Sequence, residues 1–311
     1  MFPLFFGPSS LSRLSSLSIM KPLISVGELI DQSWDKYRAN LPFFLQLSGW
    51  LVLVAILNTI ALLLYPSVGA IAYHTKFTFG EVTGVALYSF ANLLLSPLLG
   101  FWVFVSLAIG AKSVIDGKRM SISSVMRETQ RRYFPALVVT VLVGLTLLLA
   151  QIITFGPALI LGAIGLLAQN AWLLGTANIL LILGLIASII LTTKWTLYYM
   201  MAPYAAILDH IKNKQALQKS RALTQGKFWA VLIRIILPKI VFLLFGILIA
   251  IVIQLVLNAL IVSSTGFNLD VQQRLIALIV SVLPVLVMIF LNPLFFLSDV
   301  LLYQSLTEQS A

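Results

Sequence analysis

The sequence predicts an all-α integral membrane protein with about six transmembrane helices, and three observations lead to this fold class. Of the 311 residues, 60% are apolar and 10% are charged, whereas a soluble domain carries about 25% charged residues. The charges are clustered, so that five long stretches contain no Asp, Glu, Lys or Arg. These stretches lack the alternating pattern of transmembrane β-strands, so that helices must satisfy the backbone hydrogen bonds in lipid.

The uncharged stretches give the number and the approximate positions of the helices. A hydrocarbon core about 30 Å thick needs about 20 helical residues. The stretch 133–193 has 61 residues and accommodates two spans, with Gly156 and Pro157 marking an outer bend, and each other stretch holds one. The expected spans are Leu41–Tyr65, Val85–Ala111, Pro135–Ile153, Leu173–Thr193, Ile240–Val262 and Leu275–Leu297. We expect one membrane domain over residues 25–305, between a disordered or interfacial tail (1–24) and a short C-terminal tail (306–311).

The basic residues predict the orientation in the membrane. The N-terminal segment and the second and fourth connections together hold 18 Lys and Arg, whereas the opposite side holds only Lys76 and Arg274. Under the positive-inside rule, both termini and the two basic connections are cytoplasmic, and we expect a multi-pass protein of the cytoplasmic (inner) membrane. This topology explains the net charge of +10. No stacking-aromatic or groove-binding motif accompanies the charge, so that nucleic-acid binding is not expected.

A similar pattern precedes the first, third and fifth spans, which suggests three helical hairpins. Each copy contains an amphipathic segment, a basic residue and then aromatic residues; the copies are 28–47, 123–142 and 216–235. In the first copy, Ser25 and Glu28 have the spacing of a capping box. We expect each amphipathic helix to lie along the cytoplasmic leaflet. A genuine repeat would arrange the hairpins around a pseudo-threefold axis, whereas topology alone also selects basic and aromatic flanks.

Groups that could perform chemistry are scarce in the spans. There are no cysteines, no Gly-rich phosphate loop and no nucleophile elbow, so that no enzyme activity, cofactor or metal is expected. Asp299 is the acid nearest to a span interior; we expect a solvated helix end, with a cation or proton site as the alternative. Asp209 and His210 could form a local pair at the end of the fourth helix. Amides such as Asn58, Asn92 and Gln151 are expected to bridge helices, with the lining of a polar cavity as the alternative.

The segment 212–239 contains seven basic residues and no acid. We expect it to bind anionic lipid headgroups or an acidic surface of a protein partner on the cytoplasmic face, because each basic residue near an anionic leaflet contributes about 1 kcal/mol. The alternative is that these charges only fix orientation. The candidate binding residues are Lys212, Lys214, Lys219, Arg221 and Lys227.

The segment from Ala216 to Trp229 reads Ala-x-x-x-Ser-x-x-Leu-x-x-Gly-x-x-Trp. Together with the opening segment SVGELIDQSWDKYRANLPFFLQL, it resembles the bacterial group that includes the glycerophosphoryl diester phosphodiesterase membrane domain and YciC-like six-span membrane proteins. The resemblance implies a six-span fold over roughly residues 26–303. In some members this domain is fused to a soluble phosphodiesterase domain, which this sequence lacks, so that the resemblance implies no catalytic residue.

A second resemblance concerns permease subunits of ABC importers. Ala222, Gly226 and the later Ile-Ile-Leu-Pro run are similar to the cytoplasmic loop that docks on the ATPase, although Ser220 and Arg221 depart from that pattern. The sequence thus predicts a non-catalytic membrane protein that acts through membrane lipids, envelope maintenance or assembly with partners. The alternative is a transporter or permease subunit that couples through residues 216–238.

Overall fold

The structure is a computed structural model that describes residues 22–66, 70–71, 76–118, 120–266 and 268–310. All regular secondary structure in these ranges is helical, and six helices in them are long and apolar enough to cross a membrane. The predicted fold class is therefore confirmed. Of the predicted N-terminal tail, residues 1–21 lie outside the described ranges.

The six long helices form three hairpins. In the first, α2 (Leu41–Ser48), η1 (Gly49–Leu51) and α3 (Val52–Leu64) are followed by α5 (Phe79–Phe90), the π-helix η2 (Ala91–Leu95) and α6 (Ser96–Ile115). The second hairpin pairs α7 (Ile122–Leu167) with α8 (Ala171–Tyr199), and the third pairs α11 (Phe228–Thr265) with α12 (Leu269–Ser310). Three shorter helices lie before or between the hairpins: α1 (Val26–Ala39), α9 (Ala202–Leu208) and α10 (Asn213–Thr224).

An amphipathic segment precedes each hairpin, as predicted, and buries an apolar residue together with a hydroxyl-bearing residue one turn later. These pairs are Leu29 and Ser33 in α1, Val125 and Thr129 at the start of α7, and Ala216 and Ser220 in α10. The spacing of four residues places both members of a pair on the same helix face. The segments therefore pack onto the protein through one face. The capping box that begins α1 is also confirmed: Glu28 N donates to Ser25 Oγ, and Ser25 N donates to Glu28 Oε2.

The turn of the second hairpin differs from the expectation. α7 continues through Gly156 and Pro157 to Leu167, and the turn lies at residues 168–170. Asn170 caps α8, because its Oδ1 accepts hydrogen bonds from the amides of Trp172 and Leu173. An N-cap satisfies amides that a helix start leaves open, whereas a proline can remain inside a membrane helix when neighbouring groups compensate. The hairpin therefore turns at residues 168–170 and not at Gly156 and Pro157, which lie inside α7.

One glycine in each hairpin permits a close helix crossing. A Cβ atom added at Gly184 of α8 would lie 2.5 Å from the backbone oxygen of Thr154 in α7. A Cβ atom added at Gly84 would lie 2.6 Å from the backbone carbonyl carbon of Leu64. One added at Gly246 would lie 2.4 Å from the side-chain Cδ1 of Leu291. Small residues at such crossings let helices approach closely in lipid, where packing rather than water drives association.

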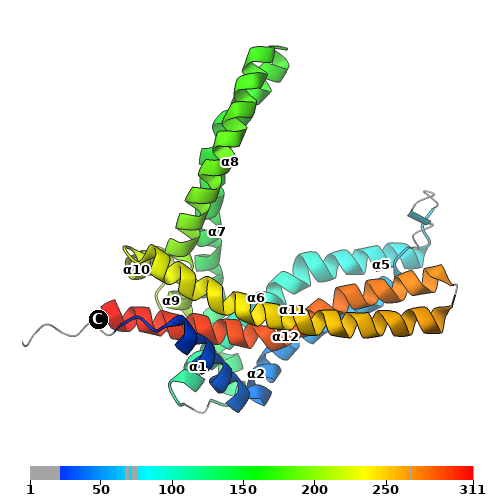
Figure 1. Cartoon of the computed structure of the whole chain (residues 1–311), viewed down its shortest axis with the longest axis horizontal. Coiled ribbons are helices and arrows are strands. Elements are labelled where there is room, and N and C mark those ends of the chain that lie inside the picture. Colours follow the sequence, from blue (N-terminus) through cyan, green and yellow to red (C-terminus); the bar gives the residue numbers. More distant parts are fainter. Residues whose placement is uncertain (1–21, 67–69, 72–75, 119, 267, 311) are drawn as a thin grey trace, which may run out of the picture.

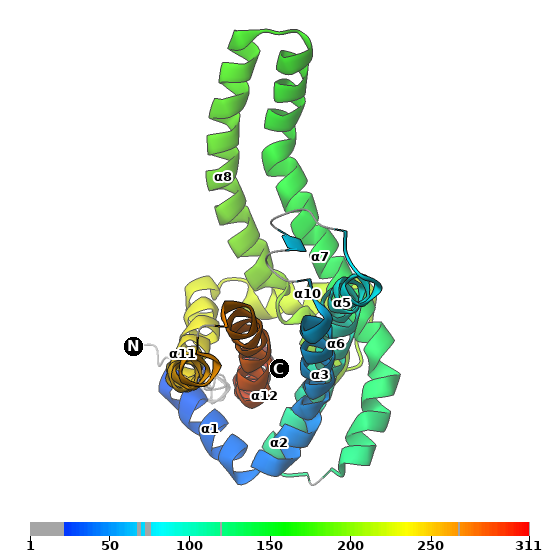
Figure 2. The ribbon, with the colours of Figure 1, turned by 90° about the vertical axis from the view of Figure 1, so that its right-hand side faces the viewer.

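The three hairpins extend from a common hub, which consists of α9, α10 and the parts of α6, α7 and α12 that pack around them. The hairpins do not extend from it in equivalent directions. The first and third lie side by side and extend in one direction, whereas the α7–α8 hairpin extends in another (Figures 1 and 2). The pseudo-threefold arrangement that an exact repeat would give is therefore not observed. At the hub, α12 continues to Ser310 and buries Leu306, so that residues 306–310 belong to the last helix rather than to a tail.

Candidate functional site

The short helix α9 occupies the centre of the hub, and a buried acid holds it to α12. Asp299 of α12 is 4% exposed. Its Oδ2 accepts a hydrogen bond of 2.7 Å from the Tyr204 hydroxyl of α9 and lies 2.9 Å from Lys239 Nζ of α11. The expectation of a solvated helix end was therefore wrong: a buried charge requires a partner, and α9 and α11 supply two.

A second group of one lysine, one aspartate and one tyrosine lies nearby. Here α12 supplies the tyrosine, and the aspartate follows α9. Tyr303, one turn after Asp299 on α12, donates to Oδ2 of Asp209, which follows α9. Lys219 Nζ of α10 lies 2.6 Å from the same oxygen. Asp209 therefore pairs across the hub rather than with His210. The two Lys–Asp–Tyr groups, defined by Asp299 and Asp209, lock α9, α10, α11 and α12 together.

Two further basic side chains satisfy the carbonyl groups at the C-terminal end of α9. Lys112 Nζ of α6 donates to Leu208 O over 3.2 Å, and Arg132 of α7 donates to Ile207 O while pairing with Glu128. Cations at a helix C-terminus bond the open carbonyls and interact favourably with the helix dipole. Part of the basic charge on this side is therefore structural.

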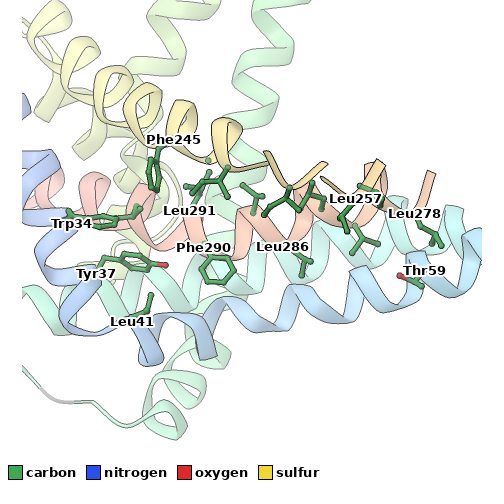
Figure 3. Close-up of a pocket in the computed structure, with 18 residues that line it drawn as sticks. Trp34, Tyr37, Leu41, Thr59, Phe245, Leu257, Leu278, Leu286, Phe290 and Leu291 are labelled. Carbon is green, nitrogen blue, oxygen red and sulfur yellow. The ribbon is translucent and has the colours of Figure 1, made fainter. Parts of the chain in front are cut away.

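An apolar groove runs from the hub toward the hairpin tips, between α1, α3, α11 and α12 (Figure 3). Its volume is about 790 Å³. On α12 its lining extends from Leu278 to Leu294, which corresponds to about 24 Å at 1.5 Å per helical residue. One leaflet of a hydrocarbon core about 30 Å thick is about 15 Å deep, so that the groove can hold an extended chain from one leaflet.

Tyr37 places a polar atom in this groove. Figure 3 shows its hydroxyl directed along the groove, on the side of Phe290, with Trp34 at the same end. No hydrogen-bond partner of this hydroxyl occurs in the described part of the chain. Burial raises the pKa of Tyr37 to about 12, so that the phenol stays protonated at neutral pH. It can therefore donate a hydrogen bond to an acceptor that enters the groove.

The structure separates the five candidate binding residues into three groups. Lys219 pairs with Asp209, and Lys227 donates a hydrogen bond of 2.7 Å to Gln309 Oε1. Lys212 and Lys214 are exposed at the start of α10. Arg221 is exposed and lies over the ring of Tyr198 in α8. The basic segment is thus not one continuous patch.

The two motifs that carried the resemblances lie in α10, a turn and the start of α11. Ala216, Ser220 and Leu223 form the buried face of α10. Gly226 has φ +80°, a left-handed conformation that favours glycine, and forms the turn before α11. The segment 216–238 is therefore helix, turn and helix, with one face of α10 packed inward and the other exposed.

The amide bridges are confirmed at two places. Asn92 Nδ2 in η2 donates to Asn58 Oδ1 in α3 over 3.0 Å. Gln151 in α7 bonds both Ser188 and Thr192 in α8 over 2.8 Å. These contacts hold helices of the same hairpin together.

Two features were not expected from the sequence: the groove, and the position of Lys194, whose Nζ lies 5.9 Å from the centroid of the Tyr198 ring. The groove needs side chains from helices far apart in the chain, so that no local pattern indicates it. Lys194 was counted only as a topology charge, although it is followed by three aromatic residues, at 195, 198 and 199. Such aromatics after a span are typical of the headgroup region, and this signal was available.

Among the described residues, no group of three or more His, Cys, Asp or Glu side chains could hold a metal ion. No family model matches the chain, and no curated protein or solved structure matches it. The resemblance to the phosphodiesterase membrane-domain and YciC-like group therefore stays a prediction from the sequence.

Proposed function

We propose that the protein is a non-catalytic, lipid-binding protein of the bacterial inner membrane that holds a lipid acyl chain in the groove between α1, α3, α11 and α12. The observation that carries the proposal is the Tyr37 hydroxyl, which is directed into this mostly apolar groove and has no hydrogen-bond partner among the described residues. An acyl chain gains little by moving from bilayer to groove, because lipid tails are as apolar as leucine. Selective binding therefore needs a polar contact, and Tyr37 can donate to a lipid ester carbonyl.

The position of Tyr37 fits this role. It lies in α1, just before the first apolar span, beside Trp34. Tyr and Trp are enriched at the membrane interface, where one end of the side chain is apolar and the other meets polar groups. A lipid ester lies at the same depth, between headgroup and tail.

The orientation proposed for the protein places both termini and the hub on the cytoplasmic side. The 18 basic residues on one side of the predicted spans support it. Lys76 and Arg274 belong instead to the tip regions of the first and third hairpins. The groove then opens to the inner leaflet at the end that holds Tyr37.

The test is the amount of lipid that co-purifies with the full chain in a mild neutral detergent, measured by native mass spectrometry. Ile249→Trp places a large ring in the groove, because Ile249 lines it. The matched control is Leu248→Trp, at an exposed neighbour that does not line it. We expect Ile249→Trp to carry one bound lipid fewer per protein than the parent and Leu248→Trp to carry the same number as the parent.

Tyr37→Phe removes only the hydroxyl. A hydrogen bond worth about 1 kcal/mol corresponds to about a fivefold loss of affinity. Equal lipid occupancy in the parent, Ile249→Trp and Tyr37→Phe would contradict the proposal.

A further inference from the structure

Two cationic side chains from different helices converge on one tyrosine ring at the hub end of α8. Lys194 Nζ and the guanidinium carbon of Arg221 each lie 5.9 Å from the centroid of the Tyr198 ring. Both cations line a cavity of about 510 Å³. The other side chains that line it are those of Trp195, Tyr199 and Gln225.

The packing of α10 on α8 fixes this arrangement. Ser220 is buried, and its hydroxyl donates a hydrogen bond of 2.7 Å to the carbonyl oxygen of Tyr198. Arg221 is the next residue and is therefore held beside the Tyr198 ring. Lys194 reaches the same ring from one turn earlier on α8, because residues four apart share a helix face.

The cavity has an excess of positive charge. None of its six lining residues is acidic, and neither Lys194 nor Arg221 forms an ion pair in the described part of the chain. Two like charges near one another repel, and an anion between them removes that cost. The planar guanidinium of arginine matches two phosphate oxygens, and lysine adds a point charge.

An apolar groove leads away from this cavity between α7 and α8. Its volume is about 570 Å³, and Lys194 lines both the groove and the cationic cavity. On α8 the groove extends from Leu180 to Lys194, which is about 21 Å at 1.5 Å per residue. A groove of that length can hold an extended acyl chain.

We infer that this site binds one phospholipid with an anionic headgroup, with its phosphate between Lys194 and Arg221 and an acyl chain in the α7–α8 groove. Charge complementarity selects the phosphate, and the groove that starts at Lys194 selects a lipid over a free anion. The site is separate from the groove at Tyr37 and shares no lining residue with it. Each site can therefore fail its test without the other.

The test is a titration of the full chain in neutral detergent with phosphatidylglycerol, followed by native mass spectrometry at physiological salt. At about 1 kcal/mol for each basic contact, we expect Lys194→Gln and Arg221→Gln each to weaken binding about fivefold, and the double variant about thirtyfold. Both side chains are exposed, so that their replacement leaves the packing of α8 and α10 unchanged. The matched control, Lys212→Gln with Lys214→Gln, removes the same charge from exposed positions outside the cavity and should weaken binding less than threefold.

Two further comparisons identify the ligand: one uses variants of the groove, and the other uses different ligands. Leu183→Trp blocks the groove, whereas Leu185→Trp lies outside it, and only the first should weaken phosphatidylglycerol binding. Phosphatidylcholine should bind at least fivefold more weakly than phosphatidylglycerol, and inorganic phosphate at the same concentration should not displace the lipid. An equal loss in the control variant would show diffuse electrostatic attraction, and binding of inorganic phosphate alone would show an anion site; either result overturns the proposal.

Discussion

Tyr204 of α9 donates a hydrogen bond of 2.7 Å to Asp299 of α12, across 95 residues of sequence. This contact lies beside its counterpart, in which Tyr303 of α12 donates to Asp209 after α9, and the two tyrosine rings are 6.4 Å apart. A tyrosine of α9 thus donates to an aspartate of α12, and a tyrosine of α12 donates to the aspartate that follows α9. A lysine forms an ion pair with each aspartate. These contacts hold together the hub from which all three hairpins extend.

Substitutions of Lys239 and Asp299 should have non-additive effects on the free energy of unfolding, because the two side chains form an ion pair. Lys239→Met leaves the buried carboxylate with one partner, and breaking a buried pair costs about 3 kcal/mol or more. We expect each of Lys239→Met and Asp299→Asn to lower the free energy of unfolding, and the double variant to cost clearly less than the sum. Unfolding of the purified chain in detergent measures this double-mutant cycle. Additive losses would show that the pair does not stabilise the hub.

The close crossing at Gly184 predicts opposite effects for two glycines on α8. Gly184→Ala places a methyl group against the Thr154 carbonyl and should destabilise the second hairpin by about 1–3 kcal/mol. Gly175→Ala meets no atom within 4 Å and should be neutral or stabilising by up to about 1 kcal/mol. Thermal unfolding in detergent compares them. Equal effects would mean that α7 and α8 are not held together at this crossing.

Single cysteines test the orientation, since the native chain has none. Cysteines at Ala168 and Ser264, near the tips of the second and third hairpins, should react with an impermeant thiol reagent added to intact cells. Cysteines at Ser123 and Gln218, on the hub side, should react only after the cells are opened. All four positions are exposed, and none of their side chains caps a helix; Ala168, the C-cap residue of α7, contributes only its backbone amide. Labelling of Ser123→Cys from outside would reverse the proposed topology.

The capping box of α1 predicts a dependence on pH. Hydrogen bonds from the Ser25 backbone and side chain lower the pKa of Glu28. A depressed folded-state pKa stabilises the native state above the unfolded pKa, and this contribution is lost as pH falls through the folded pKa. Hydrogen exchange in the first turn of α1, corrected for intrinsic rates, should therefore stay slow down to acidic pH and then accelerate. Glu28→Gln keeps an acceptor without the titration and should abolish this dependence.

Local features were predictable where one short segment decides the outcome. The capping box at Ser25 needs only a residue three positions later, and its geometry is as expected. The turn at Asn170 shows the limit, because the sequence also offers a proline at 157. Both residues can end a helix, and the choice between them depends on whether α7 and α8 remain packed along their full length.

The candidate sites were less predictable for the same physical reason. Of the predicted binding residues, Arg221 is exposed beside the Tyr198 ring, whereas Lys219 and Lys227 bond other parts of the chain. A basic side chain looks the same in sequence whether its partner is lipid or a carboxylate. Only the position of Asp209 and Gln309 in space separates these cases.

The sequence by itself determined that the chain forms six helices long and apolar enough to cross a membrane, in three hairpins, with most basic charge at one end. Those features follow from the length of uncharged segments and from their flanks, which are properties of neighbouring residues. Only the tertiary structure decided that Asp299 is buried, that Tyr37 faces a groove and that Lys194 and Arg221 both lie beside the Tyr198 ring. Each of these depends on how helices pack against one another, since the groups concerned come from different helices.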